Sequence, residues 1–298
     1  MNRASVPLSV LVPTRNEAAN IEECLRSVAF ADEVVVVDSR STDGTAELAA
    51  REGARVVDFQ WNGRYPRKKN WALENVPFRH EWLLIVDADE RVTAALAEEI
   101  AARLREPGPD GFFVNRRFFF MDGWLDHCGY YPSWNLRLFR HARGRYETPA
   151  GGEDTGSGDN EVHEHVVLDG RSAYLRHHLL HYAYPTIDAW VEKHNRYSSW
   201  EASVGARDRE ASDRTLPARL LGNALERKRW LKRMAPRGLG RPTLRFLYHY
   251  VWRQGFRDGY RGFVFCRLMG WYEFLSVVKV RERARARRHD PGAWRTET

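Results

Sequence analysis

Cysteine is scarce in this sequence, with three residues in a chain of 298. Cys24, Cys128 and Cys266 lie far apart, are odd in number and show no C-x-x-C spacing. A disulfide framework or a zinc knuckle needs closely patterned cysteines, so neither is expected. We predict that all three are buried or partly buried thiols of a protein in a reducing cytoplasm.

Long apolar runs are also missing. No stretch of 18 apolar residues occurs, and the longest candidate, Phe263 to Val280, is interrupted by three charged residues. We therefore predict no membrane-spanning helix. The opening MNRASVPLSVLVP lacks the apolar segment that follows the basic residues of a secretory signal, so no such signal is expected.

Acidic residues are sparse in the C-terminal third. From Arg214 to Thr298 the chain has 21 Lys and Arg against 6 Asp and Glu, whereas the net charge of the whole chain is +7. Aromatic residues are interleaved with the basic ones, a pattern typical of helices that lie on an anionic membrane. A helical cap that packs on the rest of the protein would show the same pattern, so both interpretations stay open.

The remaining sequence predicts an α/β fold. In the first hundred residues β-rich apolar runs alternate with helical patterns, which favours a mostly parallel, mixed sheet. After Gly111 the pattern changes to further strands and then, from Thr186, to helices. We therefore expect one α/β domain over residues 1–184 and a helical C-terminal region over residues 185–298. The expected strands are Leu8–Pro13, Val34–Asp38, Ala54–Phe59, Trp82–Asp87, Phe112–Phe120, Leu136–Phe139 and Val162–Leu168, and the expected helices are Glu17–Phe30, Ala46–Arg51, Lys68–Glu74, Thr93–Leu104, Ile187–Ala206, Leu216–Met234 and Thr243 to about Arg288.

Acidic side chains follow the expected parallel strands. Asp38 ends one strand, and Asp87 and Asp89 end another. Ligands bind at the carboxyl ends of the strands in such sheets, and residues i and i+2 of an extended chain point to the same side. Carboxylate oxygens suit Mg²⁺ or Mn²⁺, which would stabilise a diphosphate leaving group. The spacing thus predicts a divalent metal and a nucleoside diphosphate at this edge.

Four segments carry a resemblance to a known family. LSVLVPTRNEAANIEECLRSV, VVVVDSRSTDGTAELA, KKNWALE and WLLIVDADE resemble the nucleotide-binding half of family-2 inverting glycosyltransferases of GT-A fold. The chain is more closely similar to a bacterial subgroup that includes lipopolysaccharide-core β-glucosyltransferases. In that subgroup DADE is followed by R-L-F and then V-H-E, found here at Leu136–Arg140 and Val162-His163-Glu164. The resemblance covers roughly residues 8–202 and implies that residues 1–184 form the catalytic domain.

The resemblance also implies roles for matching residues. Asp89 would be the direct metal ligand, and Asp87 would help to hold the metal ion and also face the nucleoside. His181 would complete the metal or diphosphate contacts. Glu164 would be the base that deprotonates the acceptor hydroxyl, with His163 as the second choice. The residues expected to bind the donor are Pro13, Arg15, Glu17, Asp38, Lys69, Asn70 and Asp87.

The activity implied is a metal-dependent, inverting transfer of one sugar from a nucleoside-diphosphate sugar, with uridine diphosphate as the family-level expectation. The Q-x-x-R-W signature of processive members is missing, because Gln254-Gly255-Phe256-Arg257 is followed by Asp258. The acceptor would be a glycan or a lipid-linked glycan of lipopolysaccharide or another envelope polysaccharide. The enzyme would be cytoplasmic, and membrane contact by its C-terminal region would place it at the inner face of the cytoplasmic membrane.

Two other functions fit parts of the sequence. A nucleotidyltransferase also holds metal and diphosphate at strand ends, but its glycine-rich, lysine-bearing loop is replaced here by Pro13–Glu17. A nucleic-acid-binding protein would explain the Arg-rich end. It would leave the acidic strand ends unexplained, because carboxylates repel phosphate unless a metal intervenes, and we expect no nucleic-acid partner.

Overall fold

The computed structural model describes residues 5–147, 165–207 and 240–289. The chain forms two compact units. The α/β unit comprises Met1–Asp126 and Tyr130–Pro185, and the helical unit comprises Thr186–Thr298 with the short segment His127–Gly129. The expected helix Leu216–Met234 and the candidate base residues His163 and Glu164 lie outside the described residues.

The α/β unit is built on a nine-stranded mixed sheet. Its strands follow the order β3-β2-β1-β4-β8-β6-β11-β5, and β7 pairs with β6. The first four strands are mutually parallel, whereas β8 runs antiparallel to both β4 and β6. The bounds are β1 Val6–Thr14, β2 Ala31–Asp38, β3 Arg55–Asp58, β4 Trp82–Ile85, β5 Glu90–Val92, β6 Gly111–Phe120, β7 Gly123–Leu125, β8 Ser133–Arg140 and β11 Ser172–His181, with β9 Gly144–Tyr146 and β10 Val166–Leu168 forming a separate pair.

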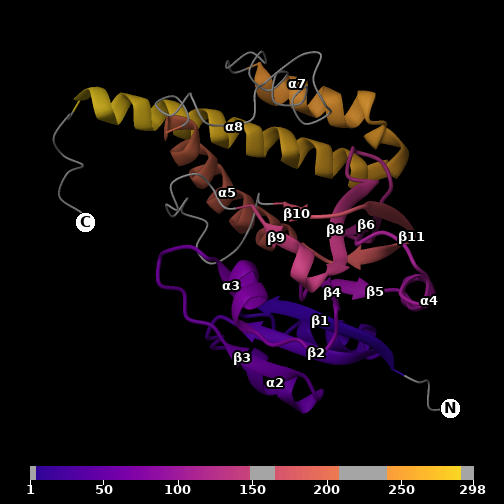
Figure 1. The fold of residues 1–298 in the computed structure, drawn as a ribbon. Coiled ribbons are helices and arrows are strands. Elements are labelled where there is room, and N and C mark those ends of the chain that lie inside the picture. The colour runs from indigo at the N-terminus through magenta and orange to yellow at the C-terminus, as the bar shows by residue number, and fades with distance from the viewer. Residues whose placement is uncertain (1–4, 148–164, 208–239, 290–298) are drawn as a thin grey trace. The chain divides into compact units, whose positions relative to one another are not determined.

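Helices cover both faces of the parallel part of the sheet (Figure 1). Along β1, Val10 and Val12 enter one apolar core and Leu11 enters the other, because successive side chains of a strand point to opposite faces. The first core contains residues of α1 (Ile21–Ser27), α2 (Thr45–Arg51) and α4 (Ala94–Arg103), and the second contains residues of α3 (Lys68–Asn75). This confirms the predicted α/β class, since parallel strands buried on both faces read as continuous apolar runs.

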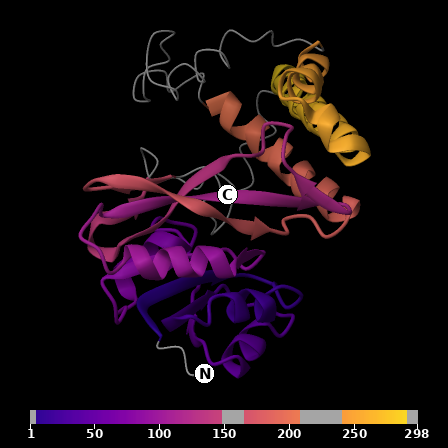
Figure 2. The same ribbon diagram turned by 90° about the vertical axis from the view of Figure 1, so that its right-hand side faces the viewer.

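The second half of the sheet contains three strands that were not predicted from the sequence: the short strands β5 and β7 and the long strand β11. The long strand β11 was not predicted, although it lies beside β6 over most of its length (Figure 2). Its register shifts between Tyr174 and His178, so its sequence, SAYLRHHLLH, does not keep the alternation of a regular strand. The first predicted helix is also shorter than expected, because the turn before Ile21 is held by the loop after β2.

In the helical unit, α5 (Ile187–Arg207) and α7 (Arg241–Leu247) both pack on α8 (Gly259–His289). The predicted single helix from Thr243 to Arg288 is wrong. The chain passes through a π-helical turn, η2 (Tyr248–Trp252), and a 3₁₀ turn, η3 (Gly255–Asp258), before α8 begins. Gln254 has φ 56°, a left-handed value that ends a helix, and Gly255 lies so close to two sulfurs that a Cβ there would be 2.7 Å from Cys266 Sγ.

Within the described residues no helix has both the length and the apolar character needed to cross a bilayer. All three cysteines are free thiols with buried side chains, and their burial was predicted from the sequence.

Candidate functional site

The carboxyl ends of β2, β1 and β4 lie next to one another in the sheet. Ser39 N donates to Thr14 O at 3.0 Å, and Val86 N donates to Leu11 O at 3.0 Å, so the chain segments that leave these strands start side by side. Among the predicted donor residues, Pro13 lies near the end of β1 and Arg15 and Glu17 follow that strand. Asp38 is the last residue of β2, and Asp87 follows β4. The sheet therefore brings these acidic residues to one edge, as the sequence predicted.

Asp38 is almost fully buried and organises the loop that follows β2. Its carboxylate accepts hydrogen bonds from Thr14 Oγ1 at 2.8 Å, from Ser41 N at 2.8 Å and from Ser41 Oγ at 2.6 Å. Ser41 Oγ in turn accepts from Asn16 N, whose residue has a left-handed backbone with φ 55°. The loops after β1 and β2 are thus tied into one rigid edge, beside which the Glu17 carboxylate accepts from Asn20 Nδ2 at 2.8 Å.

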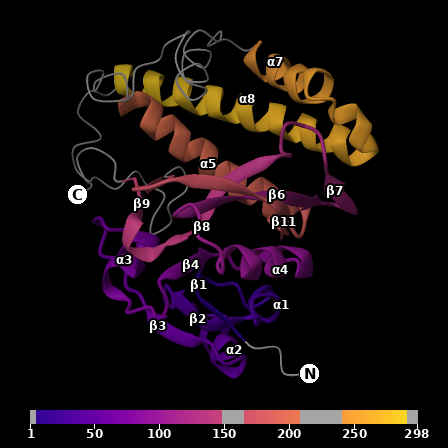
Figure 3. The same cartoon turned by 45° about the vertical axis from the view of Figure 1, so that its right-hand side comes forward.

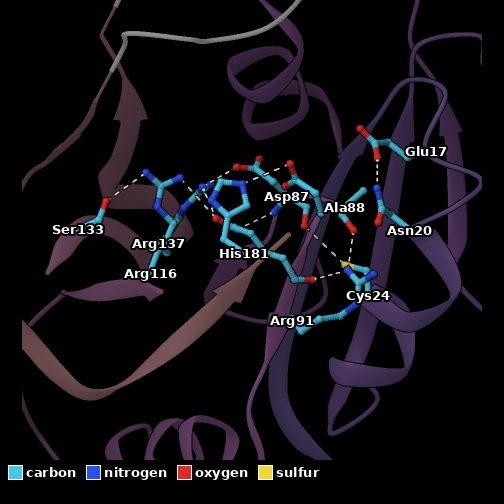
Figure 4. A network of polar contacts seen from close by, with 12 residues as sticks. Glu17, Asn20, Cys24, Asp87, Ala88, Arg91, Arg116, Ser133, Arg137 and His181 are labelled. Carbon is cyan, nitrogen blue, oxygen red and sulfur yellow. Dashed lines mark hydrogen bonds and ion pairs between the residues drawn. The ribbon is translucent and has the colours of Figure 1, made fainter. Parts of the chain in front are cut away.

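Asp87 is held between two cations. Arg137 Nη2, on β8, lies 2.5 Å from Asp87 Oδ2, and Lys69 Nζ, on α3, lies 2.9 Å from Asp87 Oδ1 (Figure 4). Burial by itself would raise the pKa of Asp87, but the charges of Arg137 and Lys69 outweigh it and hold that pKa well below its usual value. Asp87 is therefore an ionised carboxylate with a fixed orientation.

A second carboxylate, Glu90, lies completely buried behind Asp87. Glu90 Oε1 is 3.1 Å from Arg137 Nη2 and 3.5 Å from Arg116 Nη1, and Glu90 Oε2 accepts from Asp87 N at 2.9 Å. The negative charge beside Arg137 also raises its pKa well above the usual value, although burial alone would lower it. Asp87 and Glu90 thus pair with three cations, Lys69, Arg116 and Arg137.

Asp89 lies in the turn between β4 and β5, close to His181 at the end of β11. His181 Nε2, at the end of β11, lies 3.2 Å from Asp89 Oδ2, and Tyr182 N donates to Asp89 O at 2.8 Å. Both side chains are largely buried, and His181 Nδ1 has no hydrogen-bond partner among the described residues. Figure 4 shows the His181 ring next to Asp87 and Arg137. The structure therefore assembles His181 and Asp89 from sequence positions almost a hundred residues apart.

The Asp89–His181 pair fits a divalent metal ion. Two cis ligands of an octahedral ion with bonds of about 2.1 Å have donor atoms about 3 Å apart, close to the separation found here. The described residues contain no group of three or more His, Cys, Asp or Glu side chains that could hold a metal. Such a site would need its other ligands from phosphate oxygens and water, which is how Mg²⁺ is commonly bound.

Lys69 and Asn70 have different roles in the structure. Lys69 pairs with Asp87, as described above, whereas the Asn70 amide joins α3 to β9. Asn70 Nδ2 donates to Tyr146 O at 2.9 Å, and Asn70 Oδ1 accepts from Tyr146 N at 2.8 Å. Both functional groups of that amide thus bind backbone, so Asn70 fixes the position of α3, the helix that carries Lys69.

The sequence analysis gave no role to Arg116, Arg137 or Glu90. Arg116 Nε and Arg137 Nε are buried atoms without a hydrogen-bond partner among the described residues, as is His181 Nδ1. Buried polar atoms are nearly always paired, so three such atoms beside the same carboxylates make this group a candidate ligand-binding centre. The available signal was Arg137 itself, a lone charge in the apolar run LRLF, because a charge in a buried strand needs a partner.

An α/β sheet with charged groups at the carboxyl ends of its parallel strands is the arrangement of a nucleotide-binding enzyme. The model of the family "Glycosyl transferase family 2" matches residues 9–158. The "Lipopolysaccharide core biosynthesis glycosyltransferase LpsC" of Rhizobium meliloti (strain 1021) is 30% identical over 93% of this chain and 93% of its own. The chain belongs to glycosyl transferase family 2 and is a glycosyltransferase.

Two further similarities extend over most of the chain. An uncharacterized glycosyltransferase of Rickettsia felis is 27% identical over 92% of this chain and 89% of its own. Among solved structures, S. aureus TarS 1-349 is 17% identical over 97% of this chain and 93% of that chain, with a TM-score of 0.41. Membership of the family confirms the resemblance on which the site residues were predicted, but it leaves their individual roles as proposals.

Proposed function

We propose that this glycosyltransferase is an inverting, metal-dependent and non-processive enzyme that transfers one sugar from a uridine-diphosphate sugar. The observation that carries the proposal is the Asp89–His181 pair, whose donor atoms are spaced like two ligands of one ion. The relative named for lipopolysaccharide core biosynthesis supports a glycan or lipid-linked glycan acceptor of lipopolysaccharide or another envelope polysaccharide. Such an acceptor would place the enzyme in the cytoplasm at the inner face of the membrane.

Each of the proposed site residues has a role that follows from its chemistry. A bound Mn²⁺ or Mg²⁺ ion would act as a Lewis acid on the departing diphosphate. Asp89 and His181 would hold it, and the ionised Asp87, fixed by Lys69 and Arg137, would face the nucleoside. Inversion by a single displacement also needs a base for the acceptor hydroxyl, and Glu164 remains our candidate, with His163 second.

Binding of donor and metal can be tested by thermal shift with a panel of nucleotide sugars. We expect a uridine-diphosphate sugar to raise the melting temperature with Mn²⁺ and to have little effect without it, because the remaining metal ligands come from the diphosphate. Asp89→Ala should abolish the shift. A shift of unchanged size in Asp89→Ala would refute the metal assignment.

The role of Glu164 is tested by Glu164→Gln, which removes the proton acceptor and keeps the shape of the side chain. We expect the thermal shift with donor and Mn²⁺ to remain, and sugar transfer to fall by at least about a hundredfold. His163→Gln is the matched comparison, and a larger loss there would move the base to His163.

A further inference from the structure

Helix α8 presents apolar side chains on two opposite faces. One face, which includes Phe265, Met269 and Val277, is buried within the helical unit. The opposite face is exposed, and its large apolar residues are three, four or eight positions apart, spacings that return to the same side of a helix, so they form one stripe. From the first to the last residue the stripe is about 27 Å long at 1.5 Å per residue. These residues are Tyr260, Phe263, Trp271, Phe274 and Val278.

A second stripe lies on α7 and η2, which pack along α8 (Figure 3). Its residues, Leu244, Leu247, Tyr248, Val251 and Trp252, are exposed and follow the same helical spacing. Phe246 and Tyr250 connect the two stripes, because their ring centroids lie 6.1 Å and 5.7 Å from that of Phe263. We call the two stripes, together with the exposed Phe256 between them, the aromatic face. Trp252 is 78% exposed and Tyr260 75% exposed, which is unusual for such large rings.

The charges around the aromatic face are almost all positive, because two of the nearby carboxylates are buried. Asp258 binds His127, with Nδ1 2.7 Å from Oδ1, and Glu273 pairs with Arg241 and Arg245. By contrast, the arginines of these helices reach solvent: Arg253, Arg257, Arg267 and Arg281 are all exposed. Arg267 also stacks over the Phe246 ring at 5.2 Å, which places a cation within the aromatic face.

We propose that the aromatic face is a docking surface for an anionic lipid bilayer. Aromatic rings favour the depth of the lipid headgroups, and arginines near an anionic surface are attracted to it. A second copy of the chain is a poorer occupant, because two such faces would bring like charges together. The helices would lie in the plane of the interface. Docking needs neither the sugar donor nor a metal, so it is independent of the catalytic proposal.

Flotation of the full-length protein with vesicles tests the proposal. We expect binding to vesicles of phosphatidylcholine with phosphatidylglycerol, weaker binding at high salt, and little binding to phosphatidylcholine alone. Trp252→Ser/Tyr260→Ser should lower binding at least about tenfold, since it removes two rings from the interface. Arg253→Glu/Arg257→Glu should lower binding to the anionic vesicles as well. Both variants change exposed side chains and should keep the wild-type melting temperature.

The matched control is Trp134→Ser/Tyr174→Ser, which removes one exposed Trp and one exposed Tyr from the α/β unit and should float like the wild type. Asp89→Ala should also float normally, which separates docking from metal binding. Equal flotation of Trp252→Ser/Tyr260→Ser and the wild type would overturn the proposal. So would a salt-sensitive dimer that forms in place of vesicle binding and is lost in the same variant.

Discussion

Replacing Arg137 with methionine is expected to lower the free energy of unfolding by about 3–5 kcal/mol, because the change leaves two carboxylates without their shared partner. Arg137 is 5% exposed and lies between Asp87 and Glu90, of which Glu90 is completely buried. Methionine fills a similar volume but cannot neutralise either charge. Denaturant unfolding followed by circular dichroism measures the loss.

An exposed ion pair provides the control. Arg26 pairs with Glu52 at 2.8 Å on the surface of the same unit, and Arg26→Met should lower the free energy of unfolding far less than Arg137→Met, because solvent screens an exposed pair. The double variant Arg137→Met/Glu90→Gln should recover part of the stability that Arg137→Met loses, because one of the unpaired charges is then removed. Similar losses for Arg26→Met and Arg137→Met would contradict the buried-network interpretation.

The pH dependence of stability follows from the lowered pKa of Asp87. A carboxylate whose pKa is lower in the folded than in the unfolded state stabilises the fold above its unfolded pKa, about 3.9, and loses this contribution as the pH falls through the folded value. In Arg137→Met the folded pKa of Asp87 rises, so the contribution is lost at a higher pH. We therefore expect acid unfolding of this variant to begin at a higher pH than in the wild type.

The α/β half could be predicted from local patterns. Residues 34–37 of β2 are four valines whose side chains pack on both faces of the sheet, and such an apolar, β-branched run predicts a buried parallel strand without knowledge of its neighbours. The acids at the carboxyl ends of β2 and β4 were predicted to lie on one edge of the sheet, because neighbouring parallel strands place their carboxyl ends together. Local order in the sequence thus determined which carboxylates share an edge.

The partners of those carboxylates could not be predicted in the same way. Arg137 reaches Asp87 only because β8 pairs antiparallel with β4, a contact between residues far apart in the chain. His181 reaches Asp89 because β11 pairs with β5, and the irregular pattern of β11 concealed that strand. The helix break at Gln254 also depends on the close approach of Gly255 to Cys128 and Cys266, which the sequence does not reveal.

Replacing Asp89 with asparagine or His181 with alanine is expected to lower kcat/KM by about 10²–10³, because either change removes a ligand from the ion that would stabilise the leaving diphosphate. Initial rates at increasing Mn²⁺ concentrations measure both effects, and the Mn²⁺ concentration for half-maximal rate should rise in each variant.

The 3.2 Å distance between His181 Nε2 and Asp89 Oδ2 allows a more specific test than the losses of kcat/KM in the two single variants. If both side chains bind one ion, the double variant Asp89→Asn/His181→Ala should lose much less than the product of the single losses, since an ion already lost cannot be lost again. His177→Ala, on the same strand and paired with Glu99 at the surface, is the control and should change the rate less than about twofold. Fully multiplicative losses in the double variant would mean that Asp89 and His181 act independently, and the two-ligand site would have to be abandoned.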